Sequence, residues 1–534
     1  MLVLAIVLTT RSRDDDTKAH AQASQEPSVR PIPPAPFVPR HPFTEPPVVR
    51  SRGGRLETTL TAQNGSVDIS GVTVGGAQTY SASRPNGPTE RGIVGPTLHV
   101  QRGDLVEITL DNALSIPERA TGANCPASAD GAAHDHGSTA PPAAPGTDQA
   151  TNLHFHGLHV TPRETKPFGD NVLIELPNGP SRFRFRIPRN HDRGTFWYHA
   201  HLHGCTDDQV FRGLAGMLLV GDSRRDLPRR LRRVRTRSLA LKDVQVEEPA
   251  AGDVEIAGDH DWANPTHRTV NGLVDPNIAI RPGETQLWRL ANVSSAVWYE
   301  VALVDPSTSA RDGLTVVAQD GNTLRRAVRR TSLVVPPGRR FDVLVRGPEA
   351  GTRVLKALDF DQGRLVFKED TLATVRVDGA PAPSIAPPRR LRGDTQRFPT
   401  RRGPTRRFTF DIDGRPPDVP LFTIDNAVFD PDIADATPRL GTTERWVIYN
   451  KSDEYHPFHI HQDDFRVIDA GGGPASLPGD QDIVPLPPGS PEHPSKVVID
   501  MPFTDFRGNF VFHCHILDHE DGGMMSRVSV GRRR

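Results

Sequence analysis

Four pairs of histidines in strand-like or strand-flanking stretches, each separated by a single residue, limit the local structure that this chain can adopt. The pairs lie in "HFH" (His154, His156), "HAH" (His199, His201), "HIH" (His459, His461) and "HCH" (His513, His515). Successive side chains of a β-strand point to opposite faces, so both histidines of a pair would share one face. Random placement of 21 histidines in 534 residues would give on the order of one such pair. The four pairs therefore predict extended segments that present imidazoles to a metal site.

The segment "FVFHCHILDHEDGGMM" (residues 510–525) indicates a second group of ligands. Its first residues are strand formers, so Cys514 would point away from the face that carries His513 and His515. In "HPFHIH", His456 lies three residues before His459, so on a strand it would point to the face opposite that of His459 and His461. The two segments together therefore predict one site with His456 and Cys514, separate from the site of the paired histidines.

Two further residues could complete the site of His456 and Cys514. His519 could join it if the strand ends and the chain curls back, and Met524 is the next candidate. A thiolate, two imidazoles and a distant thioether form the ligand set of a blue-copper electron-transfer site. Eight histidines without a carboxylate or thiolate suit several copper ions better than calcium, magnesium or a structural zinc ion. The zinc motifs Cys-x-x-Cys and His-Glu-x-x-His do not occur in the chain.

Length and composition restrict the class of protein. A chain of 534 residues is too long for one core and suggests roughly three domains. The 51 prolines and 46 glycines favour short strands joined by turns. With 64 Lys+Arg against 65 Asp+Glu, the charge balance gives no reason to expect a nucleic-acid partner. No apolar run reaches about 18 residues, so no membrane span is predicted.

Residues 1–49 are interpreted as an export signal followed by a proline-rich linker. Residues 2–8 are apolar and "AHA" at residues 19–21 resembles a small-residue cleavage site, but a positive segment before the apolar stretch is missing. An ordinary disordered tail is the alternative. The signal predicts an exported protein, which would be periplasmic, secreted or attached to the cell surface. "RPIPPAPFVPR" in residues 30–40 predicts an extended linker outside the fold.

Three blocks follow, at residues 50–225, 226–400 and 401–534, and each alternates strand-like runs with turn-rich stretches. Similar strand patterns in all three predict an all-β protein of three consecutive β-sandwich domains. Only the first and last blocks carry His-x-His pairs.

With these motifs in this order, the chain resembles the three-domain multicopper oxidases, a laccase-like family that includes bacterial and spore-coat laccases and bilirubin oxidases. The match covers roughly residues 55–530 and includes all four copper motifs. The resemblance implies three cupredoxin-like (Greek-key) domains and four copper ions per chain, namely one type 1, one type 2 and two type 3. It places the type 1 copper in the last domain, the trinuclear cluster of the other ions between the first and third domains, and no copper in the second domain.

The resemblance also implies a role for each ligand. The type 1 ligands are His456, Cys514 and His519, with Met524 as the axial ligand. The type 2 ligands are His154 and His459. The type 3 ligands are His156, His199, His201, His461, His513 and His515.

Oxygen reduction consumes protons, so a carboxylate is expected beside the trinuclear cluster. Glu520 matches an acidic position that the family uses in proton relays. Asp170, in "FGDNV", is a second candidate, and an ordinary surface charge is the alternative for it. Cys125 and Cys205 could form a disulfide in an exported protein, or remain two free thiols.

The implied activity is a laccase-like oxidation of small phenols or aromatic amines, coupled to four-electron reduction of dioxygen to water. Electrons would pass from the type 1 site through Cys514 to His513 and His515, a path on the order of 10 Å. One alternative is oxidation of cuprous or other metal ions in copper tolerance, although 5 methionines form no methionine-rich stretch that would capture Cu(I). A structural copper-binding coat protein is another alternative.

Overall fold

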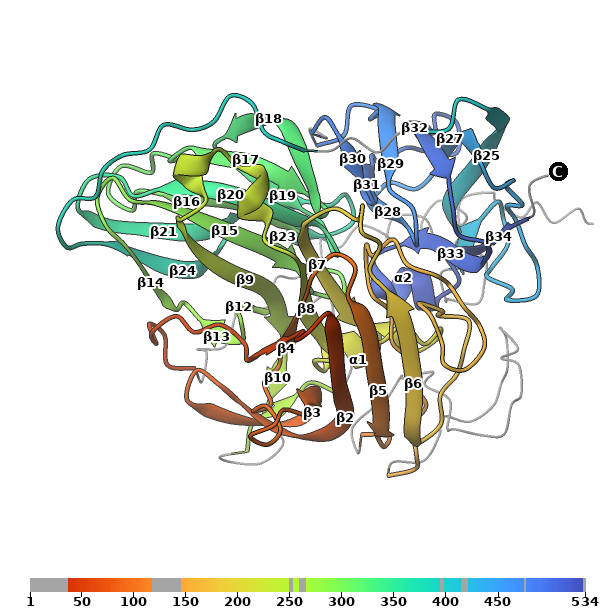
Figure 1. Cartoon of the computed structure of the whole chain (residues 1–534), viewed down its shortest axis with the longest axis horizontal. Helices are drawn as coiled ribbons and strands as arrows, with labels where there is room; N and C mark the ends of the chain where they lie inside the picture. The colour runs from red at the N-terminus through yellow and green to blue at the C-terminus, as the bar shows by residue number, and fades with distance from the viewer. Residues whose placement is uncertain are drawn as a thin grey trace, which may run out of the picture.

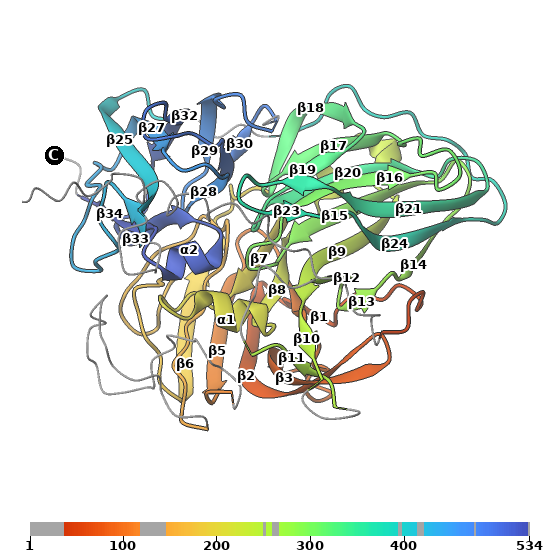
Figure 2. The same cartoon turned by 180° about the vertical axis from the view of Figure 1, so that it is seen from behind.

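The computed structural model describes residues 37–117, 146–248, 253–258, 266–393, 398–413, 421–474 and 477–531. Within these ranges the chain is almost entirely β, with seven sheets and only short helices. The predicted all-β fold is confirmed, and the sheets form three consecutive cupredoxin-like domains. In Figures 1 and 2 the first domain lies below, and the second and third lie side by side above it. No helix in the described ranges is both long and apolar enough to span a membrane.

The first domain is a sandwich of two sheets. One sheet contains, in spatial order, β1 (Val48–Arg50), β4 (Gly95–Val100), β8 (Ala215–Val220) and β7 (Gly194–His199). The other contains β10 (Val246–Glu247), β11 (Glu255–Ile256), β3 (Val72–Ala82), β2 (Arg55–Ile69), β5 (Leu105–Ala113) and β6 (Gly179–Arg186). Along β6, buried and exposed residues alternate, because one face of this strand covers the core and the other meets solvent. The helix α1 (Thr206–Phe211) follows the "HAH" motif.

The second domain begins after two short 3₁₀ helices, η1 (Ser223–Asp226) and η2 (Arg229–Leu231). Its larger sheet contains β13 (Leu273–Val274), β12 (His267–Val270), β9 (Arg235–Val244), β15 (Thr285–Asn292), β20 (Arg340–Arg346), β17 (Leu314–Gln319) and β18 (Asn322–Arg330). The facing sheet contains β14 (Asn277–Ile280), β24 (Asp370–Val377), β21 (Gly351–Leu358), β16 (Tyr299–Val304) and β19 (Leu333–Val335). A hairpin of β22 (Phe360–Asp361) and β23 (Val366–Phe367) stands apart.

The third domain has the same two-layered form. Its larger sheet contains β26 (Leu421–Ile424), β25 (Arg402–Asp413), β27 (Thr442–Asn450), β32 (Ser495–Phe503), β29 (Phe465–Asp469) and β30 (Asp480–Gln481). The smaller one contains β31 (Ile483–Leu486), β28 (His456–Ile460), β33 (Gly508–Cys514) and β34 (Met525–Val530). The helix α2 (Leu517–Asp521) lies between β33 and β34 in the chain.

The first and third domains meet at their two helices. The backbone N–H groups of Thr206 and Asp207, at the start of α1, donate to the Asp521 carboxylate at the end of α2. Both figures show α1 and α2 next to each other. Because each helix directly follows a histidine motif, their contact brings the ends of β7 and β33 together. The histidines of the two domains therefore face each other across this interface.

The last part of the expected linker belongs to the fold, so that expectation is wrong for residues 37–49. Phe37 is buried in a core cluster and contacts the ring of His267 edge-on. β1 pairs in parallel with β4, and this pairing satisfies backbone groups that would otherwise need water. The expected signal segment lies outside the described residues. The domain boundaries at 225 and 400 stay predictions, and β11, beyond the first of them, pairs with β3 of the first domain.

Candidate metal centres

Eight histidines meet in one buried group at the interface of the first and third domains, here named the histidine cluster. Its members are His154, His156, His199, His201, His459, His461, His513 and His515. Each is at most 1% exposed. The structure thus brings together the four His-x-His pairs that were predicted to share a metal site, which the sequence places as far as 361 residues apart (515 minus 154).

Backbone pairing aligns the histidines within each domain. His154 and His199 exchange N–H···O hydrogen bonds of 2.9 and 3.1 Å, which fixes the first motif beside β7. In the third domain His459 of β28 lies opposite His513 of β33. Adjacent strands keep opposed side chains about 5 Å apart. The histidines within each domain therefore lie close to one another.

Ring stacking joins the two sets across the interface. The ring of His154 stacks on that of His461, with centroids 3.8 Å apart and planes at 9°. His156 stacks on His459 in the same way, at 3.9 Å and 11°. Across the same interface the nitrogens of His201 and His513 approach to 3.3 Å, and those of His515 and His156 to 3.2 Å.

The ring nitrogens of the histidine cluster fit metal ions. Six of these histidines have a buried ring nitrogen without a hydrogen-bond partner in the described part of the chain: His154, His156, His199, His459, His461 and His515. Burial lowers the pKa of these six imidazoles and of His201, so all seven are neutral and keep a free lone pair. Unpaired buried nitrogens are costly unless they bind a metal or water. The donor set therefore fits the expected copper ions.

The ring nitrogens converge in threes. Ligand atoms lie within 4.8 Å of one another in the groups His154–His459–His461, His154–His156–His199 and His201–His461–His513. The two predicted type 2 ligands, His154 and His459, share the first group. Several neighbouring three-nitrogen sites are what a multinuclear cluster requires.

A second group, here named the thiol group, consists of His456, Cys514 and His519 on the other face of β33. The Sγ of Cys514 lies 3.4 Å from His456 Nδ1 and 3.7 Å from His519 Nδ1, and the two Nδ1 atoms are 3.3 Å apart. All three residues are buried. Burial raises the pKa of the Cys514 thiol, so a bound cation is needed to hold the thiolate form. This soft donor set fits copper.

The outer nitrogens of both histidines in the thiol group have their own contacts. Ser452 Oγ lies 2.7 Å from His456 Nε2, and Glu454 Oε1 lies 3.4 Å from His519 Nε2. The ring of Phe422 stacks on that of His519 at 4.3 Å. Such outer contacts orient a ligating imidazole, and here they turn both Nδ1 atoms towards the thiol.

The two neighbouring methionines lie in different surroundings. Met524 is fully buried in the same core cluster as Cys514, and its carbonyl accepts a 3.0 Å hydrogen bond from the Cys514 N–H. Met525 packs in a separate cluster with Val172 and Val511. This arrangement favours Met524 as the neighbour of the thiol group.

Both predicted carboxylates contact the histidine cluster. Glu520 is fully buried, with Oε2 at 2.9 Å from His513 Nδ1 and Oε1 at 3.2 Å from His201 Nδ1. Asp170 is buried as well, and its Oδ1 lies 2.9 Å from His154 Nδ1. Burial raises the pKa of Asp170 to about 8. The surface-charge alternative for Asp170 is therefore wrong.

Sequence reasoning missed an ion pair that supports the histidine cluster. Arg340 of β20 in the second domain donates to both carboxylate oxygens of Asp482, at 2.7 and 2.6 Å. Asp482 Oδ1 lies 3.6 Å from His156 Nε2, and its carbonyl lies 2.9 Å from His459 Nδ1. Burial raises the pKa of Asp482, and Arg340 opposes that shift. No local motif marks either residue, because they are 142 positions apart.

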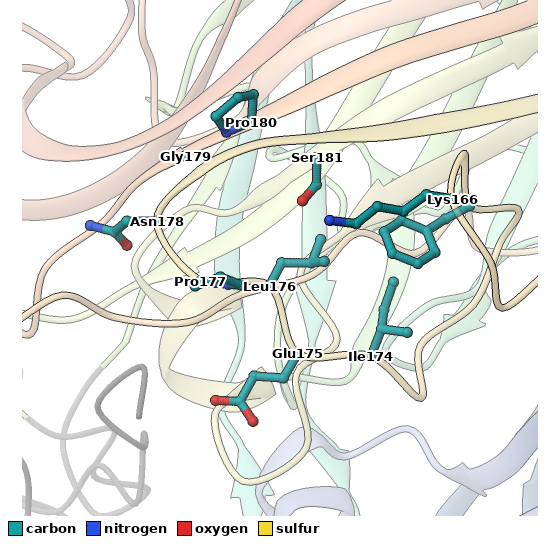
Figure 3. Close-up of a pocket in the computed structure, with 10 residues that line it drawn as sticks. Lys166, Ile174, Glu175, Leu176, Pro177, Asn178, Gly179, Pro180 and Ser181 are labelled. Carbon is teal, nitrogen blue, oxygen red and sulfur yellow. The ribbon is translucent and has the colours of Figure 1, made fainter. Parts of the chain in front are cut away.

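Two other features lie away from both groups. A surface hollow of about 400 Å³ on the first domain is lined by residues 166, 168 and 174–181, and none of the predicted site residues lines it (Figure 3). Cys205 is disulfide-bonded, while Cys125, its expected partner, lies outside the described residues.

Comparison with known proteins identifies related chains. Models of multicopper oxidase domains match residues 143–225 and 401–534, which contain every histidine of both groups. A multicopper oxidase from Staphylococcus haemolyticus is 26% identical over 499 residues, covering 90% of each chain. A laccase from Bacillus stratosphericus is 28% identical over 432 residues, covering 71% of this chain and 80% of the laccase.

The fold is also similar to solved structures. A multicopper oxidase from Campylobacter jejuni, described as a metallo-oxidase, superimposes with a TM-score of 0.72 at 22% identity. The similarity covers 95% of this chain and 98% of that protein. At this identity the likeness supports the fold of three cupredoxin-like domains.

The ion pair of Arg340 and Asp482 leads to a prediction about stability. Replacing Arg340 by Leu leaves the Asp482 carboxylate buried without its partner, which should lower the free energy of unfolding by about 3–5 kcal/mol. Chemical denaturation of the metal-free protein measures this loss. The control is Arg55→Leu, which breaks the half-exposed pair with Glu107 and should change stability by about 1 kcal/mol or less. Equal effects of the two substitutions would contradict the prediction.

Proposed function

This chain belongs to the multicopper oxidase family, and from that premise we propose that it is a laccase-like oxidase of small phenols and aromatic amines. Copper is the family's cofactor and dioxygen its electron acceptor. The observation that carries the proposal is the pairing of two donor groups on one strand, since the thiol group and the histidine cluster share β33. The type 1, type 2 and type 3 roles that the resemblance implies are proposed for the same residues here.

Copper bound at the two groups would take electrons singly from a donor and deliver four of them to dioxygen. The chain provides the connection, because Cys514 of the thiol group is covalently bonded to His513 and His515 of the histidine cluster. Side chains alternate along a strand, so a single peptide unit separates the two groups. The backbone of β33 is thus a short, rigid connection between them.

Glu520 and Asp170 are proposed to hold the protons that oxygen reduction requires. Glu520 lies against His513 and His201 and also accepts a 3.0 Å hydrogen bond from the Thr206 hydroxyl. Asp170 lies against His154 on another side of the cluster. A buried acid within hydrogen-bond distance of the reacting site can supply protons without admitting bulk water.

Electron donors are proposed to approach the edge of His519. Its side chain is 8% exposed, whereas His456 and Cys514 are fully buried. Phe422, stacked on the His519 ring and partly exposed, adds an aromatic surface beside this edge. Aromatic donors can stack on such a surface, which supports phenols and aromatic amines as substrates.

Oxidation of cuprous ions is the second candidate, and the structural relative described as a metallo-oxidase favours it. Against it, Met217, Met501, Met524 and Met525 are all buried, so the described part of the chain presents no methionine that could collect soft Cu(I) from solution. No observation favours a structural coat protein. An exported location is also proposed, from the signal-like residues at the N-terminus.

The test of the proposed function compares oxygen uptake with a phenol and with Cu(I) as electron donors. The phenol should support faster steady-state uptake than Cu(I), and the Cys514→Ser variant should show neither. Because Cys514 supplies the only thiolate of the site, this variant should also lose the blue absorption while most other copper remains. Faster uptake with Cu(I) would favour the metal-oxidase alternative. A blue Cys514→Ser protein would refute the assignment of the thiol group.

The axial ligand is tested by two single substitutions. Met524→Leu should raise the reduction potential of the type 1 copper, since a thioether donates electron density that favours the oxidised ion. Met525→Leu is the matched control, because Met525 packs in another cluster and should leave the potential unchanged. Redox titration of the blue absorption measures both. A shift with Met525→Leu alone would place the axial ligand one residue later.

A further inference from the structure

A charged contact joins the first and third domains next to the histidine cluster. His159, three residues after His156, reaches from the first domain into a site formed by Gln462, Asp463 and Asp505 of the third. Its Nε2 lies 2.6 Å from Asp505 Oδ1, and its Nδ1 lies 2.6 Å from the Gln462 carbonyl and 3.4 Å from Asp463 Oδ1.

The hydrogen bonds of His159 require both ring nitrogens to carry protons. A backbone carbonyl and a carboxylate can only accept hydrogen bonds, so Nδ1 and Nε2 must both donate. The His159 ring in this geometry is an imidazolium ion. Burial alone lowers the pKa of His159, but the bond to Asp505 and the charges of Asp463 and Asp505 outweigh it and raise the pKa to about 9.

Gln462 connects this contact to a histidine of the cluster. It directly follows His461 and has a φ of 70°, a left-handed conformation that non-glycine residues adopt only when their surroundings hold them there. His159 holds its carbonyl, and its side-chain Nε2 lies 3.2 Å from Asp170 Oδ2. Asp170 in turn contacts His154. One chain of hydrogen bonds therefore runs from the half-exposed Asp505 to the histidine cluster.

We propose that His159 is a positioning residue of the histidine cluster. As an imidazolium it connects two segments through its hydrogen bonds. One is the first-domain loop that carries His154 and His156, and the other is the third-domain segment that carries His461. His159 does so by holding Gln462 in the conformation that supports Asp170. This inference rests on the proposed function only in taking the histidine cluster as the copper site.

The contact depends on pH in a defined direction. The folded-state pKa of His159 lies above its ordinary value of 6.5, so the stabilisation is fully present below pH 6.5 and is lost as the pH rises through about 9. The acidic groups that face His159 are Asp505, for which the hydrogen bond and the charge of His159 outweigh burial and lower the pKa, and Asp463, whose pKa burial raises to about 7. His191 accepts a hydrogen bond from the His159 backbone N–H and is neutral in this range, because burial lowers its pKa to about 4.

The test measures the rate at which a chelator removes copper from the holoenzyme, as a function of pH. The wild-type rate should rise as the pH passes about 9. His159→Gln should release copper about 10- to 100-fold faster at neutral pH and show no such rise, because it cannot be charged. Asp505→Asn should move the rise to lower pH, since it removes the partner that keeps His159 protonated. The matched control is Glu164→Gln, which alters a neighbouring contact between the same domains, with Asn509, and should follow the wild type.

Two results would overturn the inference. One is a His159→Gln protein that releases copper at the wild-type rate and shows the same increase in rate at alkaline pH. The other is an Asp505→Asn protein whose rise is not shifted, since a purely structural role for His159 predicts no shift. A histidine-ring NMR titration of the metal-free protein, with His159 assigned by its loss in His159→Gln, checks protonation separately from the proposed function. A pKa at or below the ordinary value would refute the inference whatever the copper content.

Discussion

The structure depends on burying neutral imidazoles from two domains against each other. His154 stacks on His461 and His156 on His459, and each pair joins the first domain to the third. By themselves such rings stabilise an interface poorly, because each buried ring nitrogen without a hydrogen-bond partner has lost its hydrogen bond to water. Metal ions satisfy those nitrogens, so copper binding and the association of the two domains are expected to stabilise each other.

Charged and polar groups around the imidazoles hold this arrangement in place. The second domain, which contributes no predicted ligand, contributes Arg340, whose bidentate pairing fixes Asp482 beside His156 and His459. Glu520 and Asp170 contact ring nitrogens from other directions. Each carboxylate restricts the rotation of an imidazole, and oriented ligands bind a metal ion with less loss of conformational entropy.

The alternation of side chains along β33 explains why two different sites can lie so close together. The face with His513 and His515 meets the first domain, while Cys514 points into the core of the third, among Phe458, Phe512 and Met524. One site is therefore lined by imidazoles and carboxylates, and the other by a thiol and apolar side chains. These surroundings differ in the charge that they tolerate, which suits the roles in oxygen reduction and single-electron transfer that are proposed for them.

The amino-acid sequence by itself determined the strand class, the His-x-His pairs and the separation of Cys514 from its two neighbours. All three follow from the period of two along an extended backbone, which is a local property. The same alternation predicted that His456 points away from His459 and His461 and lies beside Cys514. In the structure the Cys514 Sγ is 3.4 Å from His456 Nδ1. Motif spacing also carried the resemblance to the copper oxidases.

Only the tertiary structure decided which ordinary residues serve the site. Arg340, Asp482, Gln462 and His159 belong to no motif, and Asp170 read equally well as a surface charge. Their roles depend on burial and on contacts between residues as many as 346 positions apart. Those contacts exist only after three domains have packed together, so no local pattern records them. The packing of Phe37 and β1 remained hidden for the same reason, because their partners lie in distant strands.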